Sequence, residues 1–516
     1  MKTIITRISA LTGMVVMLTV SGCTKLDEDL YGSRSVKEPG QGSDANLQSV
    51  YNQLNGQATS QENTYALQEH PTDEMMGPTR GTDWGDFGLW RKLHQHTWDA
   101  SHTQISNTWD ELNIGVFRAT EVIDGSSDNN VKAQASFLRA WFMFQITDLF
   151  GQQPFRDPAG DPDVNPTVMS RTEATDFIIK DLEFAEANLN PLTSIGVASK
   201  PAAQALLAKV YLNRAVYNAA TVGGPFTFDK ADMDKVIDYA NRVIAAGNFQ
   251  LAGSGKYFDN FSWDNTTLSK EIIFGIENSE ASAPGNPRRT WRMTLHYRHT
   301  PDGWNGFTTL ADFYKSFEST DERLGGAYPG LTDKVGLRTG FLIGQQFGPG
   351  GVPLQQRSGQ PLIFTENVNL NYSTEAQGIR VIKYFPKPEA NNTVNDDNVD
   401  NDYIFLRYAD VLLMKAEAIM RGGTDPTGQT PVAIVNSLRT LRGASALGNV
   451  DEAAMLAERG RELYWEGWRR NDQIRFGTFN NPVDQRPTAS DKTRTLYPIP
   501  QRAVDTNPNL TQNPGY

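Results

Sequence analysis

Apolar stripes with the period of an α-helix constrain the fold of this 516-residue chain more than any other feature of its sequence. Apolar side chains fall at steps of three and four from residue 105 to 123 and again from 135 to 149, on either side of a Gly-Ser-Ser-Asp break. Such spacing places them on one face of a helix. Similar segments recur at residues 178–189, 205–215, 233–246, 406–420, 430–442 and 451–468. The sequence therefore predicts helical pairs over about residues 105–247 and 403–470.

Helix–turn–helix units of this size suggest tetratricopeptide-like packing, in which stacked pairs bury a continuous core. Small residues such as Ala205 and Ala208 permit close contact between neighbouring helices. A clean repeat of about 34 residues is not visible, so a non-repetitive helical domain remains the alternative. The predicted fold class is mainly α: a tetratricopeptide-like helix–turn–helix scaffold with long loops and a few short strands.

The segments between the predicted pairs have a different composition. Prolines recur every four residues from Pro154 to Pro166, which forbids a helix and predicts an ordered crossing segment. Residues 339–402 are rich in Gly, Pro, Asn and Asp, and a strand-like alternation at residues 379–384 lies within them. Loops this long inside a compact domain are usually functional. We therefore expect ligand-face loops over about residues 60–104 and 255–402.

The first 22 residues have the pattern of a secretory signal. Lys2 and Arg7 precede an apolar run at residues 8–20, which is shorter than the roughly 20 residues that span a bilayer. Small residues precede Cys23, as at a bacterial lipoprotein cleavage site, and Cys23 is the only cysteine of the chain. An ordinary signal with a chance cysteine is the alternative. We predict a signal peptide at 1–22, lipid attachment at Cys23, a tether over 23–40 and a single domain over 41–516.

Charge and motifs exclude several classes of protein. The chain has 48 basic and 60 acidic side chains, a net charge of −12, and no run of Lys or Arg, which argues against a nucleic-acid partner. A single cysteine excludes a disulfide framework. The sequence contains no G-x-S-x-G elbow, H-E-x-x-H helix or P-loop. Two carboxylates suffice for a glycosidase, however, so the sequence does not exclude a glycan-cleaving enzyme.

A metal site is not expected. Asp and Asn alternate over residues 396–402 as at the start of a calcium-binding loop, but Asn401 stands where such a loop has Gly and Arg407 where it has Glu. We predict a solvated loop and no cofactor there, with a weak structural calcium ion as the alternative. Three histidines between residues 94 and 102 lack the accompanying ligands of a metal centre.

Four segments in order along the chain, together with the lipoprotein-like start, resemble the SusD/RagB family of outer-membrane lipoproteins. They are FLRAWF…DLFGQQP at 137–154, LRYADVLLMKAEA at 406–418, ERGREL…EGWRRNDQIR at 458–475 and LYPIP…NPNLTQNPGY at 496–516. Arg469 and Arg470 depart from the family pattern, in which an aromatic residue often occurs. The motifs span most of the chain, and their order makes the resemblance specific.

The resemblance implies a lipid-anchored, surface-exposed protein of the outer membrane of Bacteroidetes-type bacteria. Such proteins bind an oligosaccharide or polysaccharide and deliver it to a SusC-like TonB-dependent outer-membrane transporter, without catalysis. It also implies four tetratricopeptide-like pairs as a scaffold, and the acidic residues 27–29 resemble an export tag to the cell surface. A glycan-cleaving surface enzyme and a peptide-binding helical repeat scaffold are the alternatives.

Tryptophans outside the helical stripes are the main candidates for a ligand site, because sugar rings stack on flat aromatic faces. Trp84 lies in a glycine-rich polar segment, Trp291 follows a Pro-Gly-Asn-Pro turn, and Trp304 lies between Gly303 and Asn305. Family members present ligand-facing aromatic residues from these regions. The predicted ligand-binding residues are Trp84, Trp291, Trp304, Asp73, Arg80, Asp83 and Asn305. The other tryptophans that we considered, with His96, are predicted to pack in the core: Trp90, Trp98, Trp109, Trp141, Trp465 and Trp468.

The chemical class of the ligand stays open at this point. Loss of residues 1–22 removes two positive charges and leaves −14, which disfavours a polyanionic glycan. Arg288, Arg289 and Arg292 form a basic cluster that could nevertheless bind one.

Overall fold

The computed structural model describes residues 43–516, apart from 59–60, 162, 279–290 and 389–398. The chain divides into two units, residues 1–41 and 42–516, and the second contains all described residues. The predicted signal peptide, Cys23 and the tether lie outside these residues. The fold is mainly helical, as predicted, and the described strands form four two-stranded antiparallel sheets. In the described part of the chain, no helix has the length and apolar character needed to cross a bilayer.

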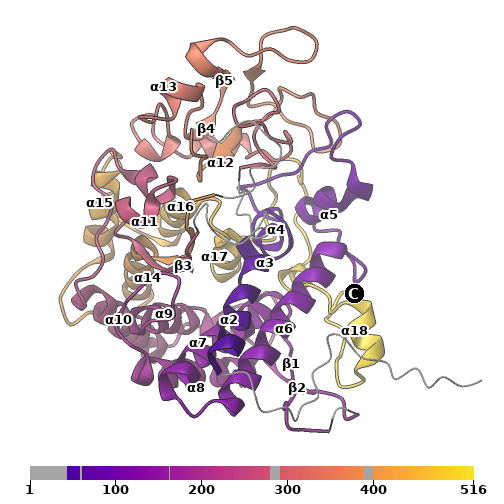
Figure 1. The fold of residues 1–516 in the computed structure, drawn as a ribbon, viewed down its shortest axis with the longest axis vertical. Coiled ribbons are helices and arrows are strands. Elements are labelled where there is room, and N and C mark those ends of the chain that lie inside the picture. Colours follow the sequence, from indigo (N-terminus) through magenta and orange to yellow (C-terminus); the bar gives the residue numbers. More distant parts are fainter. Residues whose placement is uncertain (1–42, 59–60, 162, 279–290, 389–398) are drawn as a thin grey trace, which may run out of the picture. The chain divides into compact units, whose positions relative to one another are not determined.

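Five consecutive helices form the main scaffold, and Figure 1 shows the last four of them side by side. Each packs against the next in the chain, which confirms the helical pairs predicted over 105–247. They are α6 (Thr103–Gly125), α7 (Asn129–Leu149), α8 (Arg171–Asn188), α9 (Lys200–Tyr217) and α10 (Lys230–Ala245). Gly115 of α6 permits a close approach of α7, because a Cβ there would lie 2.6 Å from the ring of Phe142 on α7.

Polar side chains determine where these helices begin. The Asp128 carboxylate accepts hydrogen bonds from the backbone N–H groups of Asn130 and Val131, which would otherwise be unpaired in the first turn of α7. Ser170 and Glu173 form a reciprocal capping box at the start of α8. The scaffold boundaries are therefore encoded locally, in residues adjacent to each helix.

Helices from the C-terminal part pack against this scaffold. α14 (Tyr408–Met420) contacts α9, α10, α15 (Pro431–Leu441) and α16 (Glu452–Leu463), and α16 contacts α17 (Arg469–Arg475). α18 (Gln501–Thr506) follows a short 3-10 helix, η5 (Lys492–Thr495). The helices predicted over 403–470 are confirmed, except that residues 403–407 form a strand.

The strands are short and lie mostly in the predicted loops. β1 (Gln153–Phe155) pairs with β2 (Thr167–Met169) around the proline-rich segment, and β3 (Ile272–Ile276) pairs with β8 (Tyr403–Arg407). β4 (Gly340–Leu342) pairs with β7 (Arg380–Ile382), which confirms the strand-like pattern at 379–384. β5 (Gly344–Gln345) pairs with β6 (Ile363–Phe364).

The predicted ligand-face loops contain more helix than their sequence indicates. Around the first of them, the short helices are α2 (Ser43–Gln53), α3 (Asn55–Ala58), α4 (Asn63–Glu69), η1 (Asp86–Gly88) and α5 (Leu89–Gln95). Those of the second are η2 (Tyr257–Phe261), α11 (Asn265–Leu268), α12 (Ala311–Lys315), η3 (Glu322–Leu324), α13 (Thr332–Val335) and η4 (Pro349–Gly351). Helices this short depend on tertiary packing, because their own hydrogen bonds do not offset nucleation. Their periodicity is correspondingly weak.

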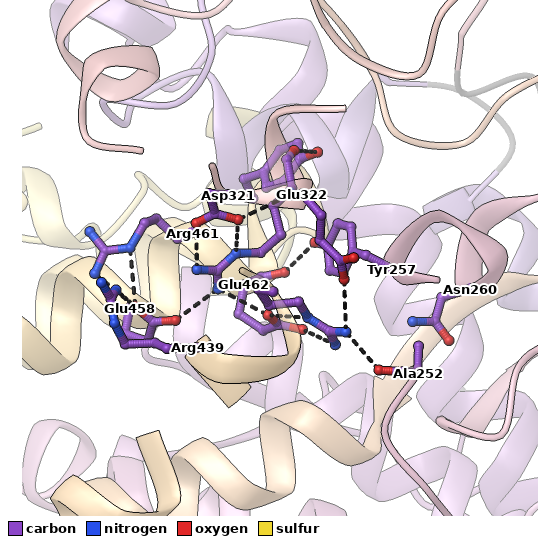
Figure 2. A network of polar contacts seen from close by, with 12 residues as sticks. Ala252, Tyr257, Asn260, Asp321, Glu322, Arg439, Glu458, Arg461 and Glu462 are labelled. Atoms are coloured by element: carbon purple, nitrogen blue, oxygen red, sulfur yellow. Dashed lines mark hydrogen bonds and ion pairs between the residues drawn. The ribbon is translucent and has the colours of Figure 1, made fainter. Parts of the chain in front are cut away.

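Buried ion pairs hold the C-terminal helices to the loop-rich part of the chain. The carboxylate of Glu462 on α16 lies 2.9 Å from Arg407, 3.1 Å from Arg442 and 3.0 Å from Arg323. Figure 2 shows Glu462 beside Glu458, to which Arg323 also donates, at 2.8 Å. Burial acts to raise the pKa of Glu462, but the three guanidinium groups hold it well below its usual value. Glu462 is therefore a charged hub shared by three segments.

Candidate functional site

A cavity of about 890 Å³ lies between two segments that are far apart in sequence. One is the segment from Asp83 to Thr103, and the other is the segment from Met293 to Trp304, with Glu62 and Arg357 at the edge. The volume lies within the usual range for small-molecule sites, roughly 300–1,000 Å³. We treat this cavity, called the main cavity below, as the candidate functional site.

An unusual backbone presents the aromatic side chains of the first segment. Trp84, Asp86 and Phe87 have φ values of 60°, 35° and 52°, in the left-handed region that non-glycine residues seldom adopt. As a result the side chain of Phe87 is fully exposed at the cavity, where burial would otherwise be favoured. Such strained conformations persist only where the surrounding structure enforces them, and they cluster at functional sites.

Trp84 is held by the second segment. Its indole N–H donates to the backbone carbonyl of Trp304 at 2.9 Å, and its ring centroid lies 5.0 Å from that of Phe307. Gly306 is required at this contact, because a Cβ there would lie 2.4 Å from the Trp84 ring. Trp84 is therefore half-buried: it lines the cavity with one part of its surface and packs against the core with the rest.

Trp304 is the exposed aromatic residue of the second segment, with 51% of its surface accessible. Its backbone N–H donates to the carbonyl of Arg292 at 2.7 Å, and the Arg292 guanidinium carbon lies 5.7 Å from the ring centroid. Half-buried Tyr297 also lines the cavity, and the guanidinium of Arg357 stacks on its ring at 4.2 Å. Aromatic faces from both segments therefore border one space.

Carboxylates outnumber cations around the main cavity. Its described lining residues include four acids, Glu62, Asp83, Asp86 and Asp302, and two bases, Lys92 and Arg357. The formal charge of this set is thus −2, since burial lowers the pKa of His102, which also lines the cavity, and keeps it neutral.

Several of these groups are oriented by neighbours. Asp83 lies 3.6 Å from Arg357, Asp302 lies 3.3 Å from Arg292, and Asp86 accepts a hydrogen bond from the Trp90 indole at 2.8 Å. A carboxylate can accept further hydrogen bonds while one oxygen is engaged. The cavity thus offers fixed acceptors beside aromatic faces, an arrangement suited to a ligand with both hydroxyl groups and apolar surface.

Three of the seven predicted ligand-binding residues line the main cavity: Trp84, Asp83 and Trp304. The structure places Trp291 and Asp73 elsewhere. Trp291 is only 6% exposed and belongs to the hydrophobic core. Asp73 forms a two-pronged ion pair with Arg469, with both N–O distances 2.7 Å. Neither residue is among those that line the cavity, because each is already engaged in packing or pairing.

Arg80 and Asn305 lie behind the cavity and support its walls. Buried Arg80 donates to the carbonyl of Gly306 at 3.0 Å, and burial without a carboxylate partner lowers its pKa to about 9. Asn305 has a left-handed φ of 55°, accepts a hydrogen bond from Arg380 at 2.8 Å and donates to the carbonyl of Glu375 at 3.1 Å. Both residues position the backbone that carries Trp304, and neither is among the residues that line the cavity.

Phe87 and Tyr297 are two aromatic lining residues that the sequence prediction missed. It also missed charged lining residues such as Asp86, Asp302 and Arg357. Phe87 lies between Gly85 and Gly88 in the same non-periodic segment as Trp84, and this context could have identified it. Tyr297 has no comparable local signal. The tryptophans predicted to pack in the core are all buried, as is His96, which confirms that part of the prediction.

The remaining sequence candidates are only partly described. Residues 396 and 398 of the calcium-like pattern, together with Arg288 and Arg289, lie outside the described residues. Asp402 is buried, accepts hydrogen bonds from Thr266 and Asn278, and has a pKa that burial raises to about 6. Within the described ranges, no group of three or more His, Cys, Asp or Glu side chains is arranged to hold a metal ion.

Two family models match the chain: the SusD family model over residues 270–516, and a model described as "starch-binding associating with outer membrane" over residues 24–212. The starch-binding protein SusD of Bacteroides thetaiotaomicron is 25% identical, and the alignment covers 88% of this chain and 85% of that protein.

Solved structures agree on the fold. A SusD superfamily protein from Parabacteroides distasonis superposes with a TM-score of 0.70 at 20% identity, covering 92% of this chain and 100% of the other. A laminarin-binding SusD-like protein gives a TM-score of 0.70 at 18% identity, covering 92% and 99%.

Proposed function

This chain belongs to the SusD family, and we propose that it binds an oligosaccharide or polysaccharide in the main cavity and delivers it to a TonB-dependent transporter. The observation that carries this proposal is the exposure of Trp304 and Phe87 at a cavity of about 890 Å³. Large apolar side chains are normally buried, so rigidly presented aromatic faces at a cavity indicate a binding surface.

The cavity chemistry fits a saccharide. A sugar ring has apolar C–H faces that stack on indole or phenyl rings, and its hydroxyl groups donate to carboxylates. Trp84 and Trp304 provide the faces, and the Asp83 and Asp302 carboxylates provide acceptors nearby. The Trp84 ring is anchored by the hydrogen bond from its indole N–H to the backbone carbonyl of Trp304, so it loses little conformational freedom on binding.

The charge of the cavity favours a neutral glycan. An anionic sugar would bring its carboxylate or sulfate close to a lining set with a formal charge of −2, or −1 when Arg292, the partner of Asp302, is included. Two like charges about 4 Å apart repel by about 1 kcal/mol in water and by about 4 kcal/mol near a protein surface. Uronic-acid or sulfated glycans should therefore bind more weakly than neutral glycans of equal length.

The relatives suggest concrete ligands for the test. One is named as starch-binding and another as laminarin-binding, so maltohexaose and laminarihexaose are the first probes. Calorimetry with the purified protein should give a saturable heat for at least one neutral hexasaccharide and a weaker one for hexagalacturonate. If extended peptides bind and none of these glycans does, the protein is a peptide-binding scaffold.

Binding without turnover distinguishes this proposal from a glycan-cleaving enzyme. The related proteins are named for binding, which supports a non-catalytic role. Incubation of each bound glycan with the protein should release no new reducing ends. Shortened products, abolished by Asp83→Asn or Asp302→Asn, would instead identify a glycosidase that uses this cavity.

The protein is associated with the outer membrane, and we assign its attachment to lipid on Cys23, which lies outside the described residues. Stable anchoring requires at least two acyl chains, as a bacterial lipoprotein cysteine provides. Cys23→Ala should therefore release the protein from the membrane fraction or stop it as uncleaved precursor.

The proposed transporter partner is tested separately. Co-purification in mild detergent from the native host should recover a large barrel protein in near-equal amount, and recovery of the protein alone would contradict the transporter partnership.

A further inference from the structure

A second cavity, of about 430 Å³, is built from the segments 255–268 and 322–339. The residues that line it do not overlap with those described for the main cavity. Trp263, which our sequence analysis assigned neither to the core nor to a ligand, lies half-buried at this second cavity. As with Trp304, the exposed part of this tryptophan could contact a ligand in the cavity.

The Trp263 ring is rigidly held. Its centroid lies 5.6 Å from that of Phe385 and 6.0 Å from that of Tyr328, and both rings stand nearly perpendicular to it, at 88° and 81°. Gly330 has a φ of +78°, and a Cβ built there would lie 3.8 Å from the indole. Edge-to-face contacts of this kind fix ring orientation. The part of Trp263 that remains exposed is therefore a pre-positioned aromatic surface.

Polar groups around Trp263 are also fixed in place. The Asp259 carboxylate accepts a hydrogen bond from the Tyr328 hydroxyl at 2.8 Å and lies 3.4 Å from the Lys256 ammonium group. Glu322 accepts hydrogen bonds from the Gly255 backbone N–H and, at 3.3 Å, from Arg442. These carboxylates keep acceptor capacity for a ligand hydroxyl group.

The buried ion network forms the support of this cavity. Figure 2 shows Glu322 and Tyr257, which both line the cavity, at the edge of the network that contains Glu462. Arg442 connects the cavity to the network, since it donates hydrogen bonds to Glu322 at 3.3 Å and to Glu462 at 3.1 Å. The floor also contains Gly325 and Thr339, whose backbones are in close contact: a Cβ on Gly325 would lie 2.1 Å from the Thr339 carbonyl oxygen. One side of the cavity is thus supported by buried, ion-paired side chains.

The second cavity repeats the chemistry of the main cavity on a smaller scale. Its described lining residues include three acids, Asp259, Asp264 and Glu322, and one base, Lys256, with a formal charge of −2. An aromatic face, a phenol and fixed carboxylates surround about half the volume of the main cavity. The arrangement suits one or two neutral sugar rings rather than a long oligosaccharide.

We infer that the cavity at Trp263 is a second saccharide site, which binds a neutral monosaccharide or disaccharide unit by stacking on Trp263 and Tyr328. The inference shares its ligand class with the proposed function but rests on a separate set of residues. A polymer could occupy both sites with different parts of its chain, so that a weak second site would raise its retention.

Fluorine NMR of the purified protein labelled with 5-fluorotryptophan tests this inference, because ten tryptophans give ten reporters. Trp263→Phe and Trp304→Phe assign the two decisive signals. The probes are glucose, galactose, mannose, xylose, maltose and laminaribiose for the second cavity, and maltohexaose and laminarihexaose for the main cavity. We expect at least one of the small sugars to shift the Trp263 signal saturably.

Two variants separate stacking from loss of structure. Tyr328→Ala should weaken the response of Trp263 about tenfold in Kd, which corresponds to about 1.4 kcal/mol, whereas Tyr328→Phe should retain most of it. Leu268→Ala, at an exposed leucine that also lines this cavity, controls for general changes at the rim. Melting curves identify any variant that fails to fold.

Each outcome decides at least one of the two proposals. If no small sugar shifts Trp263 while a hexasaccharide shifts Trp304, the second site is refuted and the proposed function stands. If Trp263 responds and Trp304 does not, the main cavity is the wrong glycan site. If neither signal responds to any probe, both assignments fail. An equal response of Trp263 in Tyr328→Ala and the unmodified protein would also overturn the second site.

Discussion

The helical scaffold and the segments around the main cavity use the same residue type in opposite ways. In the scaffold, Trp109 and Trp141 lie on regular helices and are almost completely buried. At the cavity, Trp84 and Phe87 lie on left-handed backbone, and Trp304 follows a turn, so their rings face solvent in part or entirely. Residue type alone therefore does not decide whether an aromatic side chain stabilises the fold or remains available to a ligand. Backbone conformation alone does not decide it either, since Trp465 also has a left-handed φ of 55° but is buried. The tertiary surroundings of each ring make the difference.

The two regions also differ in what holds them together. Apolar side chains and small residues pack α6 to α10, as at the contact between Gly115 and Phe142. The C-terminal helices are joined to the cavity-bearing segments by buried charges, with Glu462 at the centre. If this division is correct, changes in the scaffold and the network should affect stability, and changes at the exposed aromatic residues should affect ligand affinity.

The largest effect is expected for Glu462→Gln. This substitution keeps the shape of the side chain but leaves Arg323, Arg407 and Arg442 without their shared negative charge. Breaking a buried ion pair from one side costs about 3–5 kcal/mol. Urea denaturation should show a loss of that size, or the variant should fail to accumulate as folded protein. The matched control is Glu452→Gln. The Glu452 side chain is exposed, and its partner Arg421, whose side chain is buried, keeps a second carboxylate, Glu417, so this substitution should cost about 1 kcal/mol or less. Equal effects of the two substitutions would contradict the role of Glu462 as hub.

Trp109→Ala should lower the free energy of unfolding by about 3–5 kcal/mol, because the side chain is only 5% exposed and its removal leaves a void. Its ring packs edge-on against Phe150 at 5.0 Å. Glycan affinity should be unchanged wherever the variant remains folded. A variant that melts normally but no longer binds glycan would place Trp109 in the ligand site. It would contradict the proposed difference between the scaffold and the cavity segments.

Trp304→Ala should produce the reverse pattern. Truncation of a central aromatic contact should cost at least about 2 kcal/mol of binding energy, a loss of roughly 30-fold in affinity, with little change in melting temperature. Trp84→Ala should weaken binding and also stability, because Trp84 packs against Phe307 and Trp90. Calorimetry on both variants measures the loss of glycan affinity, and melting curves measure the loss of stability. Normal binding with early melting in Trp304→Ala would show that this residue belongs to the core.

The last prediction concerns Glu74, at the junction of the two regions, and its effect appears as a change in pH dependence. Its carboxylate accepts a hydrogen bond from the backbone of Trp465 at 3.1 Å, and burial raises its pKa to about 8. The unfolded chain releases this proton near pH 4.3. Its contribution to stability is therefore complete below about pH 4.3, declines as the pH rises, and is lost above about pH 8.

Glu74→Gln should therefore flatten the pH dependence of unfolding between about pH 5 and 8. The difference in slope from the unmodified protein should approach 1.4 kcal/mol per pH unit, the value for one proton. Denaturant titrations at several pH values measure it, and Glu452→Gln again serves as the exposed control. Identical slopes in Glu74→Gln and the unmodified protein would mean that Glu74 is charged in the folded state.

Prediction from sequence succeeded where local information was sufficient. The stripes of α6 and α7, the proline-rich crossing between β1 and β2 and the strand at 380–382 all appear in the structure as predicted. The buried tryptophans of the scaffold followed from the same periodicity. The short helices α4 and α5 were missed, because packing rather than their own sequence stabilises them.

The sequence by itself thus determined the helical scaffold and its boundaries, since periodicity of 3.6 residues and capping side chains act within one segment. It also pointed to Trp84, Asp83 and Trp304, which lie in non-periodic segments. Only the tertiary structure decided that these residues border one cavity, that Trp291 and Asp73 are committed to packing and pairing, and that Arg80 and Asn305 hold the cavity wall. The physical reason is that burial and charge pairing are properties of the folded neighbourhood. The contacts of Arg80, Asn305 and Asp73, for example, each depend on a partner more than 50 residues away in the chain.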